Sequence, residues 1–133
     1  MEHLRPEQLA ALRTRLETER DQLHARQVSE DAEAYPEHEL GDLQDKASEE
    51  ARRTTALRRR VHHDARLREV EAALQRMDQG SYGLCEETDE PIPFARLDAE
   101  PTTRYTIEAL ELLEDERARG DVSRHGRDET DAY

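Results

Sequence analysis

Two long stretches with helical spacing of apolar residues constrain this chain more than any other feature. The first stretch carries Leu9, Leu12, Leu16 and Leu23. The second carries Leu67, Val70, Leu74 and Met77, and it runs to about Gln79. Apolar residues three and four positions apart form a narrow stripe along one side of a helix, as they do in coiled coils. Two such stripes joined by one turn predict a long antiparallel helical hairpin.

Prolines and glycines mark where the two helices should begin and end. Pro6 is well placed as a first helical residue, where its missing N–H is not needed. Pro36 disfavours a helical conformation in the residue before it, so the first helix should end there. Gly80 is a good C-terminal cap for the second helix. We therefore expect a coiled-coil hairpin over residues 6–79, with its tip at residues 36–47.

The sequence changes character after the hairpin. Three prolines, Pro91, Pro93 and Pro101, interrupt its aromatic and aliphatic residues, which favours a short irregular or β-hairpin segment. Thr102 or Thr103 could then cap a last helix. Residues 80–119 should form a small globular head with this C-terminal helix. Residues 120–133 are polar and lack apolar periodicity, which predicts a disordered tail.

The composition favours an elongated protein with a protein partner. Only 34% of the residues are hydrophobic and 40% are charged, so a compact core of ordinary size would be hard to fill. The net charge of −13 disfavours binding to nucleic-acid phosphates and suits a basic partner. Neither a membrane-spanning run nor a signal peptide is recognisable, so we expect a cytoplasmic location. A single cysteine excludes an internal disulfide bond.

Residues 80–88 read Gly-Ser-Tyr-Gly-Leu-Cys-Glu-Glu-Thr, and residues 92–102 read Ile-Pro-Phe-Ala-Arg-Leu-Asp-Ala-Glu-Pro-Thr. Together they resemble the zinc-finger region of the DksA/TraR family of bacterial transcription factors. In that family an Arg-Leu-x-Ala-x-Pro-Thr run lies between two Cys-x-x-Cys pairs. The resemblance covers about residues 42–113, and the first helix matches by architecture only. It implies a mostly α fold, with the long hairpin joined to a zinc-finger-like head.

Three of the four zinc ligands of that family are missing. Its metal positions fall on Cys85, Thr88, Thr106 and Ala109. Structural zinc needs four nitrogen, sulfur or oxygen donors, and threonine or alanine cannot replace cysteine. We therefore expect a zinc-free head held by apolar contacts. Adjacent His62 and His63 should face different directions on a helix, so they predict solvated surface and no metal site.

The hairpin tip also resembles the family. Residues 42–47 read Asp-Leu-Gln-Asp-Lys-Ala, which matches an Asp-x-x-Asp-x-Ala motif at the end of the family's coiled coil. The resemblance implies that the tip enters the secondary channel of bacterial RNA polymerase. The tip residues near the catalytic centre would be Asp42, Asp45, Lys46 and Ala47. The possible further polymerase contacts are Arg52, Arg53 and Arg96.

The tip aspartates also have an ordinary structural explanation. An aspartate at the N-cap with another acid three residues later stabilises a helix start by about 1 kcal/mol. This role is compatible with a regulatory one, because capping would also hold the carboxylates in place. Replacing both aspartates with asparagine separates the two roles, since asparagine keeps the cap and removes the charge.

The resemblance further bears on the alarmone ppGpp of the stringent response. Family members bind it with basic side chains at positions that match Glu69, Glu100 and Leu110. Carboxylates would repel a pyrophosphate, so we expect cooperation with ppGpp to be weak or absent.

The main hypothesis is a non-enzymatic regulator of transcription initiation that binds RNA polymerase as a monomer. It would need no cofactor, and it would recognise neither a membrane nor a specific nucleic-acid sequence. A coiled-coil adaptor for some other protein is the alternative. A distant third is a stimulator of transcript cleavage, whose two aspartates would hold a metal ion in the active site of the polymerase.

Overall fold

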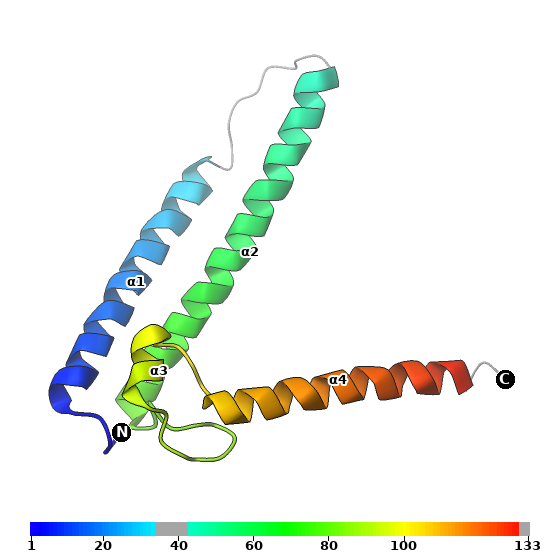
Figure 1. Cartoon of the computed structure of the whole chain (residues 1–133). Coiled ribbons are helices and arrows are strands. Elements are labelled where there is room, and N and C mark those ends of the chain that lie inside the picture. The colour runs from blue at the N-terminus through cyan, green and yellow to red at the C-terminus, as the bar shows by residue number, and fades with distance from the viewer. Residues whose placement is uncertain (34–42, 131–133) are drawn as a thin grey trace.

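The computed structural model describes residues 1–33 and 43–130, and the side chains of residues 1–30 and 45–120. Within these ranges the helices are α1 (Pro6–Glu33), α2 (Leu43–Gln79), α3 (Phe94–Ala99) and α4 (Ile107–Thr130). Figure 1 shows α1 and α2 side by side as a hairpin, with α3 at its base and α4 projecting away from it. The predicted helical hairpin is confirmed.

Local sequence signals set the start of α1 and the end of α2 as expected, whereas Pro36 lies outside the described residues. Pro6 is the first residue of α1, and the side chain of Gln8 accepts a hydrogen bond from the N–H of Arg5 at 3.0 Å, which satisfies one free donor of the helix start. Gly80 follows α2 with φ of +79°, a conformation that glycine adopts without strain. The N–H groups of Gly80 and Ser81 bond the carbonyls of Met77 and Arg76, a Schellman cap.

Both leucine-rich stripes face each other at the base of the hairpin. In α1, Leu12 and Leu16 are almost completely buried. In α2, Val70 and Leu74 are buried opposite them. Each fully buried aliphatic side chain of this size stabilises the fold by about 1.5–3 kcal/mol. The core of the protein therefore lies at the base of the hairpin, where the two stripes pack together.

The contact between the helices becomes polar towards the tip. Nδ1 of His63 lies 2.9 Å from Oε1 of Glu30, and the His63 side chain is only 19% exposed. The amide of Gln27 donates to Asp64 at 3.5 Å. His63 therefore does not lie on solvated surface, because it precedes buried Leu67 by four residues and continues the same stripe. His62 is exposed, as predicted.

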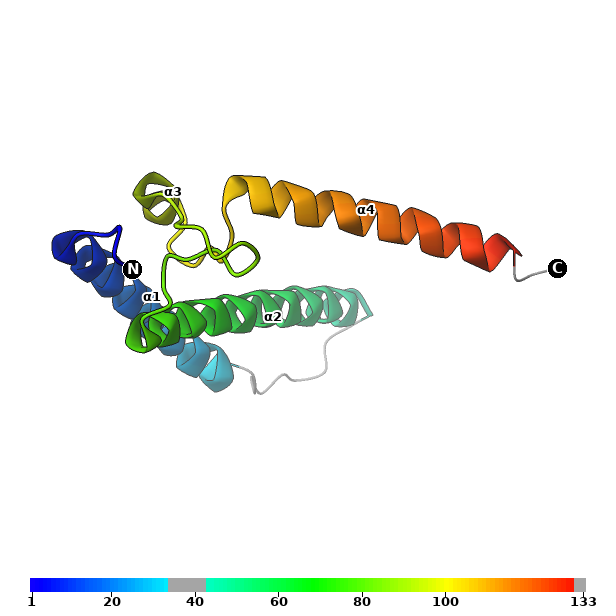
Figure 2. The ribbon, with the colours of Figure 1, turned by 90° about the horizontal axis from the view of Figure 1, so that it is seen from below.

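The head packs on the base of the hairpin through buried side chains and hydrogen bonds. Tyr82, Ile92 and Leu97 are fully buried. Only one β-bridge, Leu84 with Pro91, marks the expected hairpin-like segment. The sequence did not predict α3, which begins directly after Pro93. Figure 2 shows α3 and the loops of the head beside the hairpin base, with α4 running apart from it.

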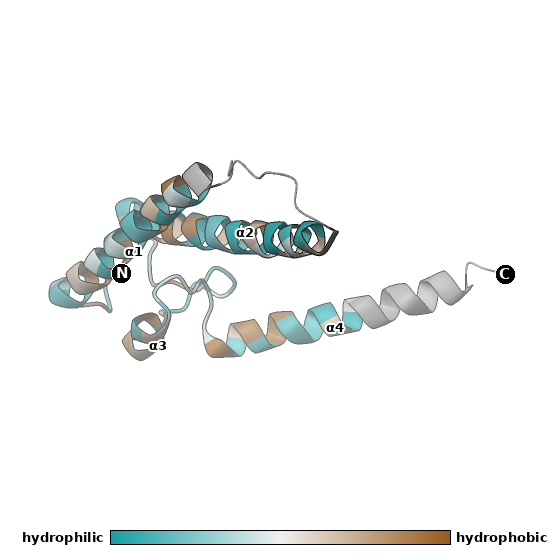
Figure 3. Cartoon of the chain, turned by 90° about the horizontal axis from the view of Figure 1, so that it is seen from above, coloured by the Kyte–Doolittle hydropathy of each residue, from teal (hydrophilic) through white to brown (hydrophobic). Residues whose placement is uncertain are grey.

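The start of α4 differs from the prediction. Thr106 caps this helix, because its hydroxyl oxygen accepts a hydrogen bond from the N–H of Ala109 at 3.2 Å. Neither Thr102 nor Thr103 is the cap. Figure 3 shows apolar residues in the first turns of α4 and hydrophilic ones after them.

The backbone of α4 is drawn as a helix to Thr130. The disordered tail expected over residues 120–133 stays a prediction. No proline occurs in residues 107–130, and a glycine inside a helix costs only about 1 kcal/mol. None of the helices in the described part of the chain is long and apolar enough to span a membrane.

Candidate functional site

The four degenerate zinc positions come together in the head. Cys85 is fully buried, and the buried hydroxyl of Thr106 donates to its Sγ at 3.9 Å. Ala109 is buried beside Thr106, whose hydroxyl caps α4. Thr88 is exposed, and its hydroxyl bonds the Cys85 sulfur. Thr88 and Thr106 therefore both contact the single thiol, and Ala109 follows in the first turn of α4.

The surroundings of Cys85 favour its thiolate. Burial alone raises the pKa of the thiol. Hydrogen bonds from the Thr88 hydroxyl and from the backbone N–H of Thr106 act in the opposite direction. The backbone N–H groups of Thr88 and Glu87 add to them, and together they lower the pKa of Cys85 from 9.0 to about 7.

These residues do not fit a structural zinc ion. One thiol, two threonine hydroxyls and an alanine methyl cannot supply the four donors of a tetrahedral site. No group of three or more histidine, cysteine, aspartate or glutamate residues in the described ranges could hold a metal ion. With one cysteine the head cannot form a C4 zinc site, and the zinc-free head stays a prediction.

Two hydrogen bonds between side chains and backbone carbonyls link segments of the head. The hydroxyl of Tyr82 donates to the carbonyl of Pro101 at 2.7 Å inside the core, and burial raises the pKa of Tyr82 to about 12. Nε of Arg96 donates to the carbonyl of Tyr105 at 2.8 Å. The sequence predicted apolar contacts in this role, and these polar links were missed because both acceptors are backbone carbonyls. Arg96, a candidate polymerase contact, also has this internal role.

The hairpin tip presents charged side chains at the start of α2. Asp45 lies in the first turn of the helix, and its side chain is exposed together with those of Lys46 and Ala47. A carboxylate in the first turn interacts favourably with the helix macrodipole, as the capping alternative requires. Asp42 lies outside the described residues. Arg52 and Arg53 follow about two turns later and are both exposed.

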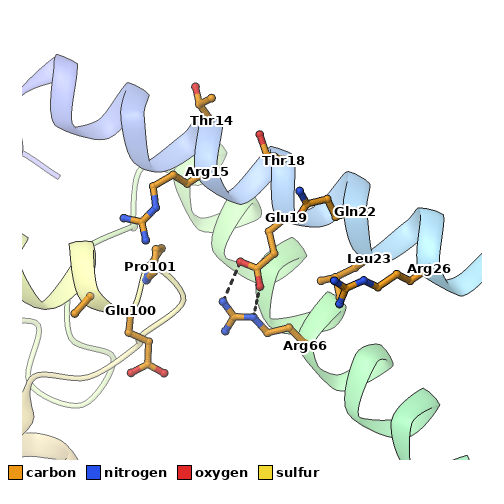
Figure 4. Close-up of a pocket in the computed structure, with 11 residues that line it drawn as sticks. Thr14, Arg15, Thr18, Glu19, Gln22, Leu23, Arg26, Arg66, Glu100 and Pro101 are labelled. Atoms are coloured by element: carbon orange, nitrogen blue, oxygen red, sulfur yellow. Dashed lines mark hydrogen bonds and ion pairs between the residues drawn. The ribbon is translucent and has the colours of Figure 1, made fainter. Parts of the chain in front are cut away.

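A groove of about 910 Å³ lies between α1, α2 and the loop that follows α3. Its main feature is Arg66, whose Nε and Nη2 donate to the two carboxylate oxygens of Glu19 at 2.6 and 3.0 Å (Figure 4). This pair raises the pKa of Arg66. A third nitrogen of Arg66 donates to Thr102 at 3.0 Å, which connects the hairpin to the head.

The sequence is similar to a known protein family and to several of its members. A family model described as the prokaryotic dksA/traR C4-type zinc finger matches residues 80–114. The RNA polymerase-binding transcription factor DksA of Caulobacter vibrioides is 47% identical over 73 residues, which cover 55% of this chain and 51% of that protein. General stress protein 16O of Bacillus subtilis is 50% identical over 50 residues, or 38% of this chain and 31% of that protein. The chain thus spans about half or less of these relatives.

A solved structure extends the likeness to nearly the whole fold. The transcription factor DksA2 from Pseudomonas aeruginosa superposes with a TM-score of 0.75 and 33% sequence identity, covering 87% of this chain and 90% of that chain. This chain belongs to the DksA/TraR family. It is a DksA/TraR protein with a single cysteine in place of the family's C4 set, as its sequence indicated.

The two acidic positions matched to ppGpp-binding residues lie around the junction of hairpin and head. Oε2 of Glu69 is 3.7 Å from Nε of Arg104, and Glu100 lines the groove beside Arg66. Leu110 is half-buried in α4. The Glu19 and Arg66 pair was not foreseen, although Glu19 interrupts the leucine stripe of α1 three residues after Leu16. In this DksA/TraR protein the guanidinium of Arg66 is therefore paired with the carboxylate of Glu19.

Proposed function

We propose that this protein regulates bacterial transcription initiation by binding RNA polymerase and inserting its hairpin tip through the secondary channel. The observation that supports this most is the hairpin itself, which ends in an exposed aspartate within the DksA/TraR fold. The 37 residues of α2 make a rod of about 55 Å. Such a rod could carry Asp45 far from the head. The C. vibrioides relative is named as an RNA polymerase-binding factor.

The carboxylates of Asp42 and Asp45 would act at the catalytic centre of the polymerase. The surrounding motif contributes Lys46 and the small side chain of Ala47. A negatively charged tip suits a channel with basic walls and a metal-containing active centre. Regulation would follow from changed stability of the initiation complex, without contact to promoter DNA. No enzymatic step is assigned to the chain, in keeping with the transcription factors of its family.

Cooperation with ppGpp is proposed to be weak or absent. A pyrophosphate would meet the carboxylates of Glu69 and Glu100 at the matched positions, where like charges repel. The nearby cationic groups are engaged, because Arg66 pairs with Glu19 and Arg104 lies near Glu69. The protein would then act through its own concentration and not through the alarmone.

In vitro transcription with polymerase from the source organism tests this proposal. Asparagine is as favourable at an N-cap as aspartate, so the Asp42→Asn, Asp45→Asn double variant removes two charges without removing a preferred capping residue. Glu50→Gln removes a charge from an exposed residue further along α2. We expect the double variant to bind the polymerase but to lose regulation, and the control to behave as the parent. Adding ppGpp should change the effect of the parent protein little. If the double variant still regulates fully, the aspartates have no role beyond capping the helix, and the adaptor hypothesis is favoured.

A further inference from the structure

Two exposed helical surfaces of this chain combine aliphatic side chains with opposite charge. The first lies on α2, where residues 52–60 contain five arginines and no acidic residue. Leu57 and Val61 are 64% and 67% exposed, and they share one face of the helix because they lie four residues apart. At about 100° per residue, Arg53 flanks them on one side and Arg58 on the other. We call Arg53, Leu57, Arg58 and Val61 the basic–apolar surface.

The hairpin does not use the basic–apolar surface for its own packing. Val70, which is buried against α1, follows Leu57 by 13 residues and so points about 140° away from it around the helix. Every side chain from residue 50 to residue 62 is exposed. Figure 1 shows that α2 also extends beyond the end of α1. The basic–apolar surface is therefore separate from the stripe that holds the hairpin together.

The second surface lies on the first turns of α4. Residues 107–116 contain five acidic residues and no basic residue. Ile107 is 53% exposed, and Leu110 is half-buried. Glu111 and Glu114 are exposed, and at about 100° per residue they lie with the two aliphatic side chains within one third of the helix circumference. We call Ile107, Leu110, Glu111 and Glu114 the acidic–apolar surface.

The two surfaces match in spacing as well as in charge. In an antiparallel pairing of the helices, Val61 would lie against Ile107. Arg53 is about 12 Å from Val61 along α2. Glu114 is about 10.5 Å from Ile107 along α4, so its carboxylate would meet the guanidinium of Arg53. Complementary charges would thus flank a shared aliphatic centre, as they do at many protein interfaces.

The two surfaces of one chain do not reach each other. No backbone contact joins α2 and α4 in the described ranges, and Figure 1 shows α4 running away from α2. Just before α4, Nε of Arg104 lies 3.7 Å from Oε2 of Glu69, and Glu69 is about 12 Å along α2 from Val61. Ile107 directly follows the buried Thr106, so it cannot cross this distance without unpacking the head. The matching surface must come from another molecule.

We propose that this protein associates with a second copy of itself, with the acidic–apolar surface of each chain docked on the basic–apolar surface of the other. Two identical contacts then form around a twofold axis, the commonest symmetry of protein dimers. Charge complementarity selects this occupant, because the arginine-rich face of α2 attracts an acidic helix and repels a basic one.

The dimer has a consequence for regulation. It covers the segment of α2 behind the tip, so the dimer is a reserve form that must dissociate before the tip can enter a narrow channel. This consequence rests on the proposed function, whereas the association itself does not. The amount of active protein would then depend on total concentration through the dimer equilibrium.

Sedimentation equilibrium of the full chain at low ionic strength tests the association without polymerase. Arg53→Glu with Arg58→Glu makes the basic–apolar surface acidic, and Glu111→Arg with Glu114→Arg makes the acidic–apolar surface basic. We expect each double variant to have a dimer dissociation constant at least about tenfold above that of the parent, because like charges then face each other. An equimolar mixture of the two should form a heterodimer with parental affinity. In it the two reversed surfaces match each other, and so do the two unchanged ones.

Matched controls separate a specific contact from effects of net charge and hydropathy. Arg52→Glu with Arg59→Glu makes the same charge change on the opposite side of α2, and its dimer should be as stable as that of the parent. Leu57→Ser should weaken the dimer about fivefold. Leu112→Ser should not, because this 62% exposed leucine lies outside the acidic–apolar surface. Circular dichroism checks that every variant keeps its helicity.

Three results would overturn the inference. The parent could stay monomeric up to about 0.1 mM, the Arg52→Glu, Arg59→Glu control could lose the dimer as strongly as the variants of the two surfaces, or the mixture could stay monomeric although the parent dimerises. Failure of the parent to bind polymerase would instead refute the proposed function and the role as a reserve form, while sedimentation alone decides on the dimer.

Discussion

Replacing Tyr82 with phenylalanine should lower the free energy of unfolding by about 1–3 kcal/mol, because it leaves a buried acceptor without its donor. The tyrosine is fully buried, and its hydroxyl donates to the carbonyl of Pro101 at 2.7 Å. Burial raises the pKa of the phenol to about 12, so the hydroxyl keeps its proton at neutral pH. The ring itself stays in place in phenylalanine, so the effect isolates the hydrogen bond. A head without a zinc ion depends on such links.

Urea unfolding followed by circular dichroism at neutral pH measures the effect. Tyr105→Phe is the matched control, because Tyr105 is only partly buried, and we expect a change below about 0.5 kcal/mol there. The dependence of the unfolding free energy on urea should be the same for all three proteins, which shows that the same surface is exposed. A Tyr82→Phe variant as stable as the parent, or an equal loss in both variants, would refute the reasoning.

Three further predictions concern the former zinc site. A chelator should leave the melting temperature of the parent protein unchanged. Replacing Thr88, Thr106 and Ala109 with cysteine should create a site that binds zinc tightly, with cobalt spectra typical of four thiolates. If this triple variant binds no metal, the geometry of a zinc site has been lost. Stability relative to Cys85→Ala should rise from pH 7 to pH 9, because the folded thiol ionises at about 7 and the unfolded one at 9.0; parallel pH profiles would contradict this. Thr106→Val should cost about 1 kcal/mol by removing the cap of α4, which urea unfolding can detect.

The hairpin could be predicted from the sequence because its signals are local and repeated. Leu67, Val70 and Leu74 recur at helical spacing, and Gly80 supplies the chain reversal that ends α2. The short helix α3 could not be predicted in this way, since six residues are too few to show periodicity.

The cap of α4 illustrates a second limit. Thr102, Thr103 and Thr106 all have the side chain that N-caps prefer, so propensity alone did not choose among them. Packing decides, because Thr106 lies against Cys85 in the core of the head while Thr102 is bonded by Arg66. The cap therefore depends on tertiary contacts.

Only those parts of the candidate site that match motifs of the family could be predicted from the sequence. The clustering of the four former zinc positions and the acidic tip followed from motifs in the sequence. The pair of Arg66 and Glu19 did not, because its partners are 47 residues apart and lie on different helices. The pairing of His63 with Glu30 was missed for the same reason. Charged residues within an otherwise apolar stripe were the one signal that could have indicated both pairs.

The measurement that tests the central claim most directly is equilibrium binding of the purified protein to core RNA polymerase, with a transcript-cleavage factor as competitor. Such factors use the same secondary channel, so the account predicts saturable binding that the competitor displaces. The Asp42→Asn, Asp45→Asn variant should bind as well as the parent. Absence of binding at micromolar concentrations, or binding that the competitor does not displace, would contradict the account.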